Sequence, residues 1–126
     1  MKASKILLRI VGIGLMIYAV SFIYNPLLLG EMIGFTHHSP NTLVEITAFY
    51  GGLELGMGVF FLWTSMRKER YYMGLMCFSI CFLAAGIFRL IGIILYGFED
   101  PSQPIVAGIE IVLPIYGFIL TKKLKS

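Results

Sequence analysis

Four ionisable side chains interrupt the long apolar runs of this 126-residue chain and are the residues best suited to chemistry: Glu45, Glu54, Arg89 and Glu110. A charge at membrane depth is costly, and it marks either a paired interior position or a functional one. A guanidinium among carboxylates can hold a small polar ligand, pass protons or simply bridge two helices. Because one arginine stands against two deep acids, Glu54 and Glu110, full ionisation would leave one carboxylate unpaired.

The predicted geometry makes Glu54 the best partner for Arg89. Helical side chains lean toward the amino terminus of their own helix, so these two residues, on oppositely directed helices, lean toward each other. Glu45 lies nine residues before Glu54 and therefore on the opposite face of an α-helix. The face of Glu54 is a polar stripe that we interpret as the bundle interior, with Thr47, Tyr50, Gly51 and Gly58. The face of Glu45 is a ridge of small residues suited to close helix packing, with Ala48, Gly52 and Gly56.

Glu110 has a second feature, because Pro114 follows it by four residues. Proline removes the backbone donor that would have bonded the carbonyl of residue 110. Unbonded backbone at membrane depth is tolerated where it faces protein or a watery cavity. The sequence therefore predicts a kink at Pro114 that opens onto a small pocket. We expect this pocket to be formed by Tyr50, Glu54, Arg89 and Glu110, with Glu45 at its rim.

The remaining reactive side chains carry weaker signals. Cys77 and Cys81 are one helical turn apart inside a single apolar run, which favours small apolar packing over thiol or quinone redox work. His37 and His38 are adjacent but have no further ligands at metal-site spacing, so no metal site is predicted. The chain shows no nucleophile and base arrangement, nucleotide fingerprint or carboxylate pair for hydrolysis. We therefore predict no cofactor, and we favour a role other than catalysis while keeping an enzyme or redox subunit as an alternative.

Helices in a bilayer must position these side chains. The chain is 58% hydrophobic and 13% charged, whereas ordinary globular domains are about 25% charged. A spanning helix needs about 20 mostly apolar residues, and four runs approach this length, at residues 6–24, 42–64, 71–96 and 104–121. The sequence thus predicts an all-α, polytopic bundle of four transmembrane helices in one domain, residues 1–126. The loop 25–41 is too apolar to be fully solvated, which predicts a short interfacial helix.

Basic residues predict the orientation of this bundle. Nine of the ten lie at the ends of the runs, in three clusters: Lys2, Lys5 and Arg9, then Arg67, Lys68 and Arg70, then Lys122, Lys123 and Lys125. Cytoplasmic segments carry an excess of lysine and arginine, so we predict a multi-pass protein of the cell inner (plasma) membrane with both termini cytoplasmic. The intramembrane charges then fall in the outer half of the bilayer. No continuous basic patch with stacking aromatics is present, which argues against nucleic-acid binding. A cleavable signal peptide is an alternative for the first run, although its apolar region is longer than usual.

Two motifs and a late glutamate carry a resemblance to a known family. They are residues 45–56, EITAFYGGLELG, residues 86–92, GIFRLIG, and Glu110 early in the last run. Through them the chain resembles the bacterial four-helix membrane family catalogued as domain of unknown function 4345, over nearly its whole length. More distantly it is similar to DoxX-like proteins, some of which accompany quinone-linked oxidoreductases or assist membrane-protein assembly. The resemblance implies the fold and the site more than an activity.

We therefore predict an integral membrane protein that binds a small polar or amphipathic ligand, or protons, at Tyr50, Glu54, Arg89 and Glu110. One alternative is a non-catalytic accessory subunit or assembly factor, in which the charges only set helix register. Another is a DoxX-like redox-associated subunit. The expected partners are the lipid bilayer and either a second copy or a larger membrane protein. Transport generally relies on repeated halves, so it would require a homodimer, for which the ridge of small residues offers an interface.

Overall fold

The computed structural model describes residues 1–125, and within them every regular element is a helix. Helix α1 spans Lys2–Tyr24, and the short α2 spans Leu28–Ile33. The second long helix has three parts, namely α3 (Pro40–Glu45), the π-helix η1 (Ile46–Leu53) and α4 (Glu54–Thr64). Helices α5 (Lys68–Tyr96) and α6 (Ser102–Lys125) follow. Four helices are long and apolar enough to cross a membrane, so the prediction of an all-α, four-span protein is confirmed.

Local sequence explains where the helices begin and end. Ser39 caps α3, because its side-chain oxygen accepts a hydrogen bond from the Thr42 backbone N–H and Pro40 occupies the first helical position. Gly34 and Gly97 follow α2 and α5 with φ of 92° and 78°, a backbone conformation that strongly favours glycine. The short helix expected in the loop 25–41 is present as α2.

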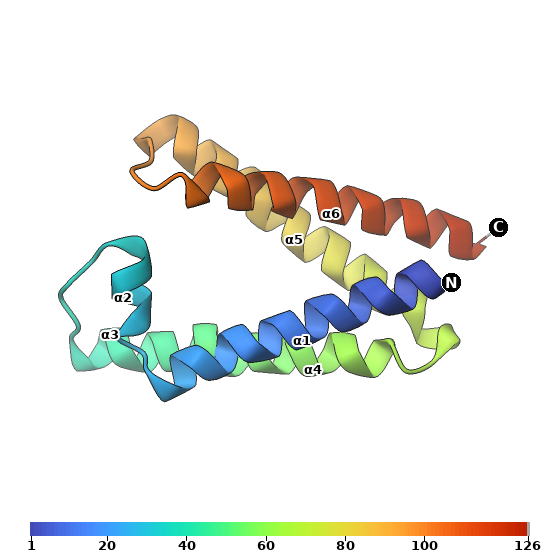
Figure 1. The fold of residues 1–126 in the computed structure, drawn as a ribbon, viewed down its shortest axis with the longest axis horizontal. Coiled ribbons are helices and arrows are strands. Elements are labelled where there is room, and N and C mark those ends of the chain that lie inside the picture. The colour runs from blue at the N-terminus through green and yellow to red at the C-terminus, as the bar shows by residue number, and fades with distance from the viewer. Residues whose placement is uncertain (126) are drawn as a thin grey trace.

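The four long helices form two antiparallel pairs. Helix α1 packs along η1 and α4, and α5 packs along α6, while the contacts between the two pairs are few. In Figure 1 the pairs meet at one end and diverge toward the other. The meeting end holds both termini and the turn between α4 and α5, and we call it the basic end because the three basic clusters lie there. The diverging end holds α2, α3 and the α5–α6 loop.

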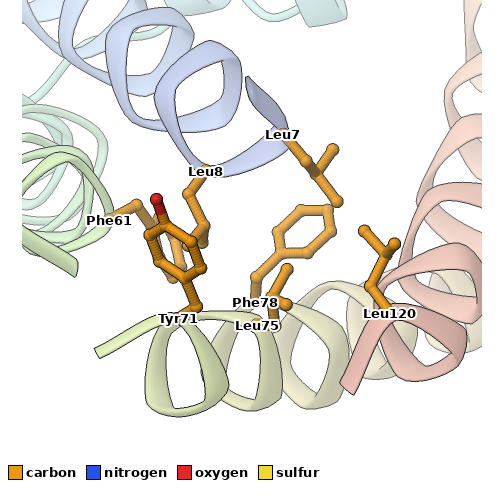
Figure 2. Packing of buried hydrophobic residues seen from close by; sticks show 7 residues of the cluster. All are labelled: Leu7, Leu8, Phe61, Tyr71, Leu75, Phe78 and Leu120. Atoms are coloured by element: carbon orange, nitrogen blue, oxygen red, sulfur yellow. The ribbon is translucent and has the colours of Figure 1, made fainter. Parts of the chain in front are cut away.

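A buried hydrophobic cluster joins the pairs at the basic end. It takes residues from all four long helices: Leu7, Leu8, Phe61, Tyr71, Leu75, Phe78 and Leu120. Figure 2 shows Phe78 reaching from α5 toward Leu7 of α1, with Leu120 of α6 beside them. The rings of Phe61 and Phe78 meet edge to face at 6.1 Å between centroids, an arrangement that aromatic pairs favour. This cluster holds the molecule together where the helices converge.

Close packing of α1 against α4 depends on Gly58, which the sequence placed on the interior face, and on Gly12, which the sequence did not single out. A Cβ on Gly12 would lie 2.8 Å from the Gly58 carbonyl oxygen, so the two backbones touch at this crossing. The predicted ridge of Ala48, Gly52 and Gly56 is exposed instead, and no atom lies within 4 Å of a Cβ built on Gly56. Within residues 1–125 the ridge therefore packs no helix, because α1 covers the face that carries Gly51 and Gly58.

Candidate functional site

A cleft of about 610 Å³ lies between the two helix pairs, and all four long helices contribute to it. Apolar side chains form most of its wall, and the charged groups on it are Glu54, Arg89 and Glu110. The lining residues are Leu15 and Tyr18 from α1, Phe49, Tyr50, Leu53, Glu54 and Met57 from η1 and α4, Cys81, Phe82, Ala85 and Arg89 from α5, and Val106 and Glu110 from α6. Four of the five predicted site residues thus share one space, all except Glu45.

Arg89 pairs with Glu110 across α5 and α6. Its Nε donates a hydrogen bond of 2.6 Å to Glu110 Oε1, and its Nη2 donates a longer one of 3.4 Å to Glu110 Oε2. Its Nη1 donates to the side-chain oxygen of Gln103 at 3.0 Å. The Glu110 side chain is 15% exposed and that of Arg89 is 34% exposed. All three guanidinium nitrogens therefore have protein partners, and the charge of Arg89 is matched by Glu110.

The prediction that Glu54 is the partner of Arg89 is wrong. That prediction, based on the direction in which helical side chains lean, assumed that the second and third long helices pack side by side along their length. In the structure α5 instead packs along α6, and it meets α4 chiefly near the basic end. The pairs diverge toward the end at which Arg89 lies, so Glu110 on the adjacent helix reaches the guanidinium first.

Gly86 explains why α5 and α6 approach so closely beside this pair. A Cβ on Gly86 would lie 2.9 Å from the Glu110 Cβ and 3.0 Å from the Glu110 carbonyl oxygen. That carbonyl is the one that Pro114 deprives of its helical donor. It therefore lies against the backbone of α5, while α6 continues through Pro114, whose side chain is fully buried. The kink at Pro114 and the opening of this carbonyl onto the pocket stay predictions, although Glu110 itself lines the cleft.

Glu54 stands apart from the pair. It lines the cleft, and its Oε2 is buried without a hydrogen-bond partner among residues 1–125. A buried polar atom without a partner costs free energy, and a carboxylate costs more than a neutral group. Within residues 1–125 no side chain or backbone group satisfies the hydrogen-bonding capacity of this oxygen.

The π-helix η1 changes which residues share a face. Its hydrogen bonds join residues five apart instead of four, and Glu45 and Tyr50 accordingly line one groove next to the cleft, with Leu29 and Phe35. Thr47 does not lie in the interior, since its hydroxyl bonds the Leu43 carbonyl on an exposed face. Phe49 and Tyr50 line both the groove and the cleft. Glu45 is therefore a neighbour of the cleft rather than part of it.

Three polar residues in or beside the cleft were not predicted to be there: Tyr18 and Cys81 line it, and Gln103 accepts a hydrogen bond from Arg89. Tyr18 and Gln103 are polar residues in or beside apolar runs, a weak signal that could have marked them. Cys81, for which the sequence favoured apolar packing, lines the cleft, and both cysteines are free. His38 packs on the ring of Phe35 in the loop after α2. Among residues 1–125 no group of three or more histidine, cysteine, aspartate or glutamate side chains is arranged to hold a metal ion.

Comparison with known protein families identifies one family model that matches the chain. The model of the domain of unknown function DUF4345 matches residues 3–121, which include almost the whole of the four long helices. No curated protein and no solved structure gives a significant match to the chain.

Proposed function

The chain belongs to the family of the domain of unknown function DUF4345, and we propose that this multi-pass membrane protein binds a small amphipathic ligand in its interhelical cleft. The observation that carries the proposal is Glu54 itself, which lines the cleft and whose buried Oε2 has no hydrogen-bond partner among residues 1–125. A ligand that donates a hydrogen bond or a positive charge to this atom would relieve its cost. Mostly apolar walls with a few polar groups are typical of small-molecule sites.

The shape of the bundle supports an amphipathic ligand over a purely polar one. At the basic end the cluster around Phe61 and Phe78 closes the space between the helix pairs. Toward the diverging end the cleft walls expose Phe49 and Leu53 by 55% and 54%. Apolar parts of a ligand can cover these side chains while its polar part reaches the carboxylates.

We place the basic end at the cytoplasmic face of the inner (plasma) membrane, with both termini inside. Both termini and the α4–α5 turn lie at this end, and each carries a basic cluster. Cytoplasmic loops are enriched in lysine and arginine. In this orientation the Arg89–Glu110 pair and the wide part of the cleft belong to the outer half of the bilayer.

A blocked cleft tests the proposal. Ala85→Trp introduces a large side chain at an exposed alanine of the cleft wall, and Ala84→Trp introduces the same side chain at an exposed alanine outside the lining. The three proteins are extracted in a mild non-ionic detergent and examined by native mass spectrometry. We expect a small-molecule adduct on the wild type and on Ala84→Trp but not on Ala85→Trp. Identical spectra for all three proteins would refute binding in the cleft.

Protons are the smallest alternative occupant, since Glu54 could exchange one without any ligand.

A second candidate function is that of an accessory subunit or assembly factor, which the exposed ridge of Ala48, Gly52 and Gly56 favours. Small residues let helices from two chains approach closely in a membrane. Co-purification of a stoichiometric partner, lost in Gly52→Leu, supports this role, and a lone stable bundle counts against it. Transport generally relies on two repeated halves, and a homodimer formed through the same ridge would supply them.

A further inference from the structure

We propose that the cleft selects a hydrophobic monocation, whose positive centre lies at Glu54 and whose apolar groups pack on the aromatic wall. This inference rests on the proposed ligand-binding function and deepens it by naming the chemical class of the ligand.

The net charge of the cleft favours a cation. The charged lining residues are Glu54, Arg89 and Glu110. Arg89 and Glu110 form a short ion pair of 2.6 Å and cancel each other. Ionised Glu54 then leaves the cleft with one negative charge in excess. A cation would neutralise this excess, whereas an anion would add to it.

Arg89 is also poorly placed to receive an anion. Its Nε and Nη2 donate to Glu110, and its Nη1 donates to Gln103. An anionic ligand would have to break one of these bonds before the guanidinium could serve it. A cation at Glu54 would break no hydrogen bond of Oε2, because this buried atom has no hydrogen-bond partner in residues 1–125.

The aromatic wall provides the second attraction. Tyr18, Phe49, Tyr50 and Phe82 all line the cleft. Ring faces attract cations, and the attraction grows when the site is desolvated. Two of these rings are held in place through Phe22, which is fully buried: it packs edge to face with Tyr18 at 4.8 Å and with Tyr50 at 5.6 Å between centroids. A hydrophobic cation would therefore meet a carboxylate and pre-positioned rings together.

The bilayer strengthens the preference. An unpaired carboxylate at membrane depth is expensive, and such groups pair with one another or mark a ligand path. A hydrophobic monocation supplies the missing charge and buries its apolar groups in the same cleft. Inorganic cations would leave the apolar part of the wall uncovered.

Two probes of one shape and opposite charge, together with a smaller neutral probe, test the inference. Tetraphenylphosphonium, tetraphenylborate and neutral triphenylphosphine oxide are titrated calorimetrically into the protein in a non-ionic detergent. We expect tetraphenylphosphonium to bind about ten- to a hundredfold more tightly than either other probe, the range that one charged contact provides. This comparison needs only the wild-type protein, so it stands even if a variant does not fold.

Two glutamate variants test whether Glu54 is the carboxylate that binds the cation. Glu54→Gln should weaken tetraphenylphosphonium binding about tenfold or more, while Glu69→Gln, at an exposed glutamate near the basic end, should leave it unchanged. Similar affinities for the three probes, or equal binding by Glu54→Gln, would overturn cation selectivity. If Ala85→Trp still abolishes binding in that case, ligand binding in the cleft survives. If none of the probes responds to Ala85→Trp, the cleft is not their site and the proposed function fails as well.

Discussion

The two ends of the bundle are built on opposite principles. At the basic end, buried apolar side chains from four helices fill the space between the pairs, among them Phe61, Phe78 and Leu75, which are at most 1% exposed. Toward the diverging end the same helices separate around a cleft that contains an ion pair and a lone carboxylate. The basic end supplies the packing that holds the two helix pairs together. The diverging end leaves side chains available for contact with another molecule.

The cleft contains a second contrast, between a satisfied carboxylate and an unsatisfied one. Glu110 receives two hydrogen bonds from Arg89, while the Oε2 of Glu54 receives none from residues 1–125. In membranes, polar contacts between helices contribute only about 0.6 to 2 kcal/mol each. The difference between the two acids should therefore appear as small but opposite effects on stability.

The largest expected effect breaks the packed end. Phe61→Ala should lower the free energy of unfolding by about 3 to 5 kcal/mol, because it leaves a cavity among rings that cannot collapse fully. Phe49→Ala, at a 55% exposed ring of the cleft wall, is the matched control and should cost far less. Reversible unfolding in mixed micelles measures both. Equal losses at the two positions would show that the two ends do not differ in packing.

The next effect concerns the crossing of α5 and α6. Gly86→Ala should destabilise the protein by about 1 to 3 kcal/mol, because its new Cβ would lie within 3.0 Å of backbone atoms of Glu110. Gly92→Ala lies on the same helix with no atom within 4 Å of the added Cβ. It should be neutral or slightly stabilising, since alanine favours helix more than glycine. Melting temperatures of the two variants decide the matter, and the prediction fails if both change alike.

A smaller effect separates the two acids by their coupling to Arg89. A double-mutant cycle with Arg89→Gln and Glu110→Gln should give a coupling energy of about 0.5 to 2 kcal/mol. The same cycle with Glu54→Gln should give a value near zero, because no hydrogen bond joins Glu54 to Arg89. Unfolding free energies of the single and double variants provide both numbers. A strong Arg89–Glu54 coupling would contradict the pairing found here.

The smallest expected effect is a gain. Without ligand, Glu54→Gln should leave stability unchanged or raise it by about 1 kcal/mol or less, because a neutral amide replaces an unpartnered carboxylate. Glu110→Gln should lower stability, because it removes the charge that faces Arg89. Differential scanning fluorimetry of the two variants, purified side by side, compares the signs. A clear loss in Glu54→Gln would mean that Glu54 has a structural partner.

Much of the fold could be read from the order of residues. The apolar runs predict four helices whose centres and order agree with the structure, and each helix extends a few residues beyond the predicted start. The short helix α2 follows from the apolar loop before Ser39. The three basic clusters gather at one end because the four spans alternate in direction, which brings both termini and the α4–α5 turn to the same end of the bundle.

The partners inside the bundle were less predictable. Gly12 and Gly58 make the close crossing of α1 and α4, and Gly12 had not been predicted to take part in it. The faces were assigned with α-helical winding, and η1 shifts them between Glu45 and Glu54. Such a shift leaves no simple mark in the sequence, because an extra residue per turn is accommodated wherever neighbouring helices leave room.

The sequence by itself determined the class of the protein, the number of spans and the short list of charged side chains among which a site must be sought. These follow from local physics, because in lipid each helix satisfies its own backbone hydrogen bonds and needs only enough apolar length. Only the tertiary structure decided that Glu110, and not Glu54, pairs with Arg89. That choice depends on which helices pack side by side and where they diverge, and the close approach of Gly86 to Glu110 keeps α5 beside α6 at the pair.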